Sequence, residues 1–222
     1  MASPHAWRRY RASVFQGYLI AAILAFLVLA VLARTVAYFT FDVVITRNVQ
    51  TINAIGFDGL MRALSWIGFA PQVGFIAAFV IAFLYVSGLK WESAMTLFGV
   101  IGISAIGLAA KILVVRPRPS ADLVNVISQL SDFSFPSGHV LFFTTFFGFL
   151  LFLGYTLLKA TWGRTLLIVL FGGMVGLIGI SRIYTGDHWA SDVLAAYLLG
   201  SVWLALMVHV YRWGKPRFFV TL

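Results

Sequence analysis

The chain contains apolar blocks that are long enough to cross a lipid bilayer as helices. A transmembrane helix needs about 20 predominantly apolar residues. Six segments come close to this length: 14–36, 72–89, 94–115, 140–158, 165–183 and 189–210. Charged residues make up only 10% of the sequence, whereas about a quarter of a soluble domain is charged. We therefore predict an all-α integral membrane protein in which one domain, residues 1–222, forms a bundle of six transmembrane helices.

The composition also excludes several other classes of protein. The chain has no cysteine, so a disulfide-linked scaffold is ruled out. Its formal net charge of +9 would suit a nucleic-acid-binding protein, but the basic residues are sparse and lie mostly between the apolar blocks. Membrane topology explains their distribution better, and we expect no nucleic-acid partner.

The basic residues predict the orientation of the chain in the membrane. With six spans, both termini lie on one side, and that side collects nine basic residues and one acidic residue. The opposite side carries seven basic and six acidic residues. Because basic loops stay in the cytoplasm, we predict a multi-pass protein of the cell (inner) membrane with both termini cytoplasmic.

Two segments on the opposite, extracytoplasmic side have apolar residues at helical spacing. They are residues 43–66 and residues 121–130. We expect both to form short helices at the membrane surface. They would either pack against the bundle or serve as a lid or lipid entry point.

Three clusters of polar residues flank the predicted spans. Lys111 ends the third span and is followed by Arg118, Ser137-Gly138-His139 opens the fourth, and Arg182 precedes His188 and Asp192 around the start of the sixth. Each cluster alone has a structural explanation: a snorkelling lysine, a helix cap or a buried hydrogen bond. In the predicted topology, however, all three reach the extracytoplasmic leaflet, and no structural need explains that convergence.

The residue types in these clusters suit phosphoryl transfer. Lys111, Arg118 and Arg182 are cationic donors for an anion with several oxygens, and the amides at Ser137 and Gly138 would point at the same anion from a helix N-terminus. His188 and Asp192 are four residues apart, so on a helix the carboxylate can orient the imidazole as a nucleophile. His139 has no acidic neighbour in sequence and fits a general acid. With so many cations and few carboxylates, we expect no metal site.

The three clusters resemble the signature motifs of the type 2 phosphatidic acid phosphatase (PAP2) superfamily, which shares its site with vanadium haloperoxidases. The matching motifs are K-x6-R-P (Lys111 to Pro119), P-S-G-H (Pro136 to His139) and S-R-x5-H-x3-D (Ser181 to Asp192). They give a motif core at 111–192. The resemblance implies a phosphohistidine on His188, oriented by Asp192, with His139 as leaving-group acid and no metal or other cofactor. It further implies that Lys111, Arg118, Ser137, Gly138 and Arg182 bind phosphate.

Several other residues are expected to have structural roles. Arg116 forms a second Arg-Pro pair and is expected to be an accessory cation or part of a charged rim. Asp187 is expected to be the N-cap of the sixth span. Arg34 would snorkel or contact a substrate headgroup. The phenylalanines at 142, 143, 146 and 147 would face lipid or pack within the bundle.

The predicted function is hydrolysis of a lipid phosphate monoester or diphosphate at the extracytoplasmic face. Phosphatidate, phosphatidylglycerophosphate, a polyprenyl diphosphate and a lipid A phosphate remain open as substrates, and membrane lipids are the only other expected partners. The alternatives are a phosphotransferase with a lipid acceptor and a non-catalytic protein that binds or transports lipid phosphates. The sequence leaves the oligomeric state open.

Overall fold

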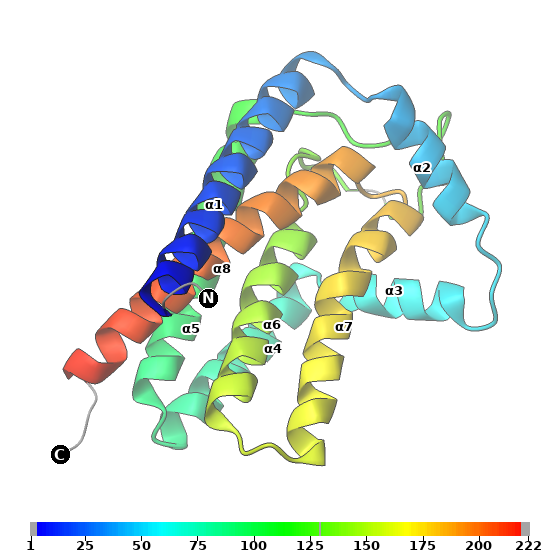
Figure 1. Cartoon of the computed structure of the whole chain (residues 1–222). Helices are drawn as coiled ribbons and strands as arrows, with labels where there is room; N and C mark the ends of the chain where they lie inside the picture. Colours follow the sequence, from blue (N-terminus) through cyan, green and yellow to red (C-terminus); the bar gives the residue numbers. More distant parts are fainter. Residues whose placement is uncertain (1–3, 129, 219–222) are drawn as a thin grey trace.

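The computed structural model describes residues 4–128 and 130–218, which form helices and connecting segments without any β-strand. Eight helices are present: α1 (Pro4–Thr35), α2 (Thr40–Gln50), α3 (Phe57–Ile67), α4 (Ala70–Val86), α5 (Lys90–Val114), α6 (Gly138–Leu157), α7 (Trp162–Tyr184) and α8 (Ala190–Phe218). Figure 1 shows the long helices as a bundle, with α2 and α3 extending to one side.

Five of these helices are long and apolar enough to cross a membrane: α1, α5, α6, α7 and α8. The second predicted span corresponds to α4, which has only 17 residues. It counts as a sixth span when it is joined to α3, from which it is bent by 69°. The prediction of a multi-pass helical membrane protein is therefore confirmed. The boundaries differ most at the ends, where α1 begins at Pro4 and α8 continues to Phe218.

Helix α6 forms the centre of the bundle. In its most apolar stretch 61% of the residues are buried, compared with 6–28% in the other four spans. The phenylalanine run of this helix accounts for much of the core, because Phe143 and Phe149 are fully buried and Phe142, Phe146 and Phe147 are nearly so. The phenylalanines at 142–147 therefore pack within the bundle and do not face lipid.

The end of α5 sets the direction of the motif residues that follow it. Val115 has a φ of 56°, and its N–H donates to the carbonyl of Lys111. A β-branched residue rarely adopts this left-handed conformation, but here it stops the helix directly before Arg116-Pro117. The chain then continues without regular secondary structure through residues 115–120, and this segment carries Arg116 and Arg118.

The prediction of short helices is confirmed for residues 43–66 and wrong for residues 121–130. The first segment contains most of α2 and α3, and both pack against the bundle, since Asp42 and Met61 are fully buried. The second segment has only a turn among its described residues. Its backbone groups are paired across the fold, with Asn125 bonded to the Gln50 side chain and Ile127 to Thr185. These tertiary hydrogen bonds replace those of a helix.

Candidate active site

A cavity of about 340 Å³ lies where the motif segments meet. The C-terminal end of α5, the N-terminal end of α6, the end of α7 and the turn before α8 all reach it. It also receives the junction between α3 and α4. Six of the eight predicted site residues line this cavity: Lys111, Arg118, Gly138, His139, Arg182 and His188. The structure thus brings together the two histidines and the three cations.

His188 is held by the turn between α7 and α8. Gly186 in this turn has a φ of 67°, and a Cβ atom there would lie 2.1 Å from the carbonyl oxygen of Asn125, so only glycine fits. The His188 side chain is 2% exposed. Its Nε2 atom lies 3.3 Å from Arg118 Nη1, and its Nδ1 atom lies 3.4 Å from Ser134 Oγ. The Nε2 atom therefore faces the cations.

The surroundings of His188 favour its neutral form. Burial lowers the pKa of His188 well below its ordinary value, and the positive charges of Arg118, Arg182 and Lys111 lower it further. A hydrogen bond with the backbone of Ser134 acts in the opposite direction. A neutral imidazole keeps a lone pair on one ring nitrogen, which a nucleophile requires.

Asp192 lies behind His188 and does not line the cavity. Its Oδ2 atom is 3.8 Å from His188 Nδ1, which is longer than a hydrogen bond. The same oxygen accepts hydrogen bonds from Ser134 Oγ at 2.5 Å and from the Trp189 N–H at 2.9 Å. Ser134 therefore lies between the carboxylate and the imidazole. From the sequence this serine has no assigned catalytic role, although it begins the run Ser134-Phe135-Pro136-Ser137-Gly138-His139.

Arg182 is fully buried, and only one of its three guanidinium nitrogens has a hydrogen-bond partner among the described residues. Its Nη1 atom contacts Ser65 Oγ and lies 3.0 Å from Asp187 Oδ2. Its Nε and Nη2 atoms have no hydrogen-bond partner among the residues that the structure describes. Two unpaired N–H donors of one guanidinium match the two oxygens of a phosphate.

Lys111 and Arg118 share a counter-ion that sequence analysis missed. Asp132 lies 2.5 Å from Lys111 Nζ and 2.6 Å from Arg118 Nη2. Burial raises the pKa of Asp132, but the hydrogen bonds and charges of Lys111 and Arg118 outweigh this effect and lower the pKa to about 2. Asp132 stays ionised at neutral pH, so a phosphate that binds both cations must compete with its carboxylate.

His139 enters the cavity from the first turn of α6. Its Nε2 atom lies 3.1 Å from the carbonyl oxygen of Ser65, which leaves Nδ1 as the nitrogen available to a bound substrate. The imidazole packs edge-on against Phe69, with 5.1 Å between the ring centroids. A Cβ atom on Gly68 would lie 2.0 Å from the imidazole, so the α3–α4 junction shapes this side of the cavity.

The other two predicted phosphate-binding residues differ in their positions. Gly138 lines the cavity as the first residue of α6, where amide N–H groups have no partner within the helix. Ser137 is fully buried and does not line the cavity. Its hydroxyl has no partner among the described residues, and its N–H lies 3.4 Å from the carbonyl oxygen of Asp192.

Three residues near the site have positions that the sequence did not predict. Arg116 is fully buried, so its predicted position on a charged rim is wrong. Asp187 is not an N-cap, because α8 begins at Ala190 and the Asp187 carboxylate pairs with Arg182 and Thr185. Arg34 donates to the carbonyl of Leu113 at the end of α5. Contacts with distant segments, which local sequence does not reveal, determine the positions of Arg116 and Arg34, whereas Asp187 is held within its own turn.

An apolar groove adjoins the cavity between α5 and α6. Its volume is about 230 Å³, and four residues line both spaces: Ser104, Lys111, Gly138 and Phe142. The rest of the groove is formed by Ile103, Gly107, Leu108 and Leu141. The site thus joins a cationic cavity to an apolar groove.

Among the described residues, no group of three or more His, Asp or Glu side chains is placed to hold a metal ion.

Comparisons with known proteins agree with this arrangement. The chain is 32% identical over 160 residues to the bacitracin transport permease protein BcrC of Bacillus licheniformis, covering 66% of this chain and 72% of BcrC. It is also 32% identical over 108 residues to an undecaprenyl-diphosphatase of Sulfolobus acidocaldarius, covering 46% of each chain. The crystal structure of a transmembrane PAP2-type phosphatidylglycerolphosphate phosphatase from Bacillus subtilis has the same fold, with a TM-score of 0.76 and 23% identity over 91% of this chain and 98% of that one.

A family model matches the part of the chain that carries the motifs. The model for the PAP2 superfamily matches residues 93–216, from the start of α5 to the end of α8, and includes every residue of the three motifs. The protein described here is therefore a multi-pass membrane protein that belongs to the PAP2 superfamily.

Proposed function

We propose that the protein is a lipid phosphatase that hydrolyses a phosphate monoester or diphosphate of a membrane lipid. The observation that carries this proposal is the single cavity lined by His139, His188 and the three cations. The adjoining apolar groove supports a lipid substrate, because a hydrocarbon chain can lie in it while the phosphate enters the cavity. The names of the relatives, a phosphatidylglycerolphosphate phosphatase and an undecaprenyl-diphosphatase, support the same substrate class.

The proposed reaction has two steps. In the first step, Nε2 of His188 attacks phosphorus, the bond between phosphorus and the lipid oxygen breaks, and protonated His139 gives its proton to that oxygen. Lys111, Arg118 and Arg182 neutralise the charge on the transferring group, while the amide of Gly138 donates from the helix N-terminus. In the second step, His139 takes a proton from water, which attacks phosphorus and releases phosphate from His188. We assign no metal or other cofactor to either step.

The test is phosphate release by the purified protein from a panel of lipids. The panel contains phosphatidate, phosphatidylglycerophosphate, a polyprenyl diphosphate and a lipid A phosphate, each with and without EDTA. We expect release from at least one lipid, unchanged by the chelator. No release from any member would contradict the proposal, and loss of activity in EDTA would contradict its metal-independent form.

A transport function is the second candidate, because the relative from Bacillus licheniformis carries the name of a transport permease. The same assay separates the two functions. A transporter moves its ligand without releasing phosphate, and a phosphotransferase releases little phosphate but forms a new phospholipid when an acceptor lipid is supplied.

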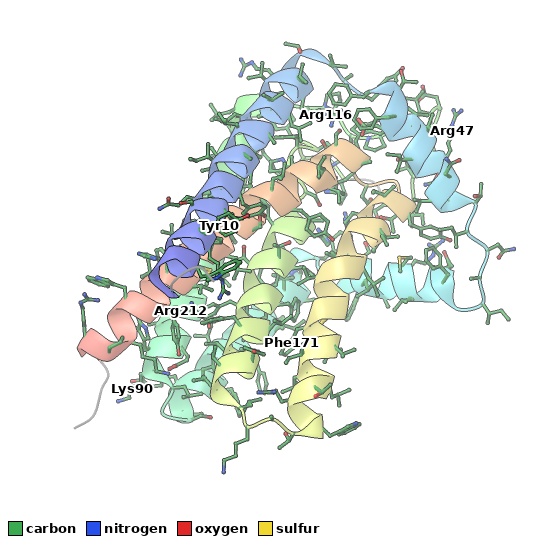
Figure 2. The ribbon with its side chains drawn as sticks, viewed as in Figure 1. Tyr10, Arg47, Lys90, Arg116, Phe171 and Arg212 are labelled. Atoms are coloured by element: carbon green, nitrogen blue, oxygen red, sulfur yellow. The ribbon has the colours of Figure 1, made fainter. Side chains whose placement is uncertain are left out.

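We also propose that the cavity opens to the extracytoplasmic side. This proposal is supported by the excess of basic residues at the opposite end of the bundle, where Figure 2 labels Lys90 and Arg212, because basic connections stay on the cytoplasmic side. The cysteine-free chain allows a direct test with Asp122→Cys in the α5–α6 connection and Lys159→Cys in the α6–α7 connection, since both positions are exposed. In intact cells an impermeant maleimide should label the first variant only. Labelling of the second variant alone would show that the cavity opens to the cytoplasm and would contradict the proposal.

A further inference from the structure

A buried charged cluster lies behind the proposed nucleophile and outside the cavity. It consists of Asp42 on α2, Arg116 in the segment after α5, and Asp192 on α8, and each of these residues is 0% exposed. Figure 2 labels Arg116 near the junction of α1 and α2, at the end of the bundle away from Lys90 and Arg212. Burying charges is costly, and a buried ion pair is weak evidence for stability, so this cluster calls for another explanation.

Arg116 is fixed on all sides of its guanidinium. Its Nη2 atom donates to Asp42 Oδ2 at 2.9 Å, and its Nη1 atom donates to Asp192 Oδ1 at 2.5 Å and to Ser191 Oγ at 2.7 Å. Its Nε atom donates to the carbonyl of Ala37 at 3.1 Å. The arginine therefore holds one oxygen of Asp192 in a defined place.

The other oxygen of Asp192 is directed towards the histidine. Oδ2 accepts from Ser134 Oγ and from the Trp189 N–H, and it is the carboxylate oxygen recorded 3.8 Å from His188 Nδ1. With Oδ1 bound to Arg116 and Oδ2 bound to these donors, the carboxylate cannot rotate without breaking several hydrogen bonds. Arg116 thus fixes the face that Asp192 presents to His188.

Asp42 sets the charge of the cluster. Its Oδ1 atom accepts from the Ser191 N–H at 2.8 Å, and its Oδ2 atom accepts from Ser191 Oγ at 2.8 Å in addition to Arg116. Two carboxylates and one guanidinium leave one net negative charge beside the histidine. Without Asp42, Arg116 alone would neutralise Asp192.

We propose that Asp42 and Arg116 are positioning residues for the phosphatase reaction, which together orient Asp192 and leave the cluster with one negative charge behind His188. That charge stabilises the cationic imidazole formed when His188 attacks phosphorus. The inference rests on the proposed function. It adds Asp42, which lies outside the segment matched by the family model, to the residues that the reaction requires.

The pH dependence of kcat/KM tests the proposal, because its acid limb follows the protonation of the nucleophile in the free enzyme. His188 faces Arg118, Arg182 and Lys111 on one side and Asp192 on the other, with His139 across the cavity. Since its pKa is depressed, the acid limb of the wild-type protein should lie below pH 6.5. Asp42→Asn removes a negative charge and should shift this limb to lower pH, whereas Arg116→Gln removes a positive charge and should shift it to higher pH.

The double variant distinguishes charge balance from simple structural damage. Asp42→Asn combined with Arg116→Gln restores one net negative charge, so its acid limb should return towards the wild-type position. Each single variant should lower kcat by about a hundredfold, with little change in KM, because misplacing Asp192 affects the transition state more than substrate binding. If Arg116→Gln does not fold, the comparison of Asp42→Asn with the double variant carries the test.

Glu92→Gln is the matched control. Glu92 is a buried carboxylate paired with Lys215 at 2.5 Å between α5 and α8, in the first turn of α5 and therefore at the helix end opposite Lys111. This variant should change stability but leave the acid limb in place. If the variants fold and their acid limbs all coincide with that of an active wild-type protein, this inference is overturned but the proposed function is not. A wild-type protein that releases no phosphate would overturn the proposed function and this inference together.

Discussion

Replacing His188 by alanine should abolish phosphate release, with a fall in kcat of about ten-thousandfold or more. The expected size follows from the role of a covalent nucleophile, whose loss leaves only the contribution of binding and electrostatics. The structure gives His188 the features that this role requires: a depressed pKa, an Nε2 atom that faces Arg118, and a support on the Nδ1 side from Ser134 and Asp192. Release of inorganic phosphate from the preferred lipid of the panel measures the effect.

Two controls make the result specific to the chemistry. His209→Ala changes an exposed histidine in the second half of α8 and should retain full activity. The melting temperature of His188→Ala in detergent should show that the variant is folded. In the wild-type protein, rapid quenching with labelled substrate should trap phosphate on His188 through an acid-labile P–N bond. A folded His188→Ala protein that keeps even a tenth of the wild-type rate would remove His188 from the mechanism.

The fold was largely predictable because lipid imposes simple length and polarity rules. Apolar runs of about 20 residues separated by charged connections define most of the spans without any knowledge of packing. The exception is α4, whose break from α3 places Gly68 and Phe69 beside His139. Gly68 and Pro71 mark the break in the sequence, because a C-terminal glycine and a proline in the next first turn end one helix and start another. The bend of 69° itself depends on how the two helices pack.

The site was predictable only where its residues fall in short motifs. His139 and His188 stand next to other motif residues, so their convergence could be inferred from topology. Asp42 and Asp132 act across long sequence separations, through Arg116 and through Lys111 and Arg118. One signal for Asp42 was present, because a carboxylate in the apolar run Phe41–Ile45 is costly unless it has a buried partner.

Arg182→Lys should lower kcat by about a thousandfold. A guanidinium that contacts the transferring phosphoryl group commonly contributes this much or more to catalysis, and lysine cannot reproduce its planar pair of donors. In the structure, Nε and Nη2 of Arg182 are the buried donors without a described partner, while Nη1 is already bound to Ser65 and Asp187. Lysine retains the positive charge opposite Asp187, so the loss should fall on the reaction and not on folding.

The comparison with another arginine shows whether the free donors of Arg182 matter. Arg62→Lys is the matched control, since Arg62 pairs with Asp58 at 2.8 Å on the exposed face of α3 and has no contact with the cavity. It should leave kcat unchanged. For Arg182→Lys we also expect weaker inhibition by orthovanadate, an anion with the oxygens of the transferring group, in proportion to the fall in kcat/KM. If Arg182→Lys retains kcat within about tenfold of the wild type and binds vanadate equally well, Nε and Nη2 do not contact the phosphoryl group, and Lys111 and Arg118 must stabilise its charge after displacing Asp132.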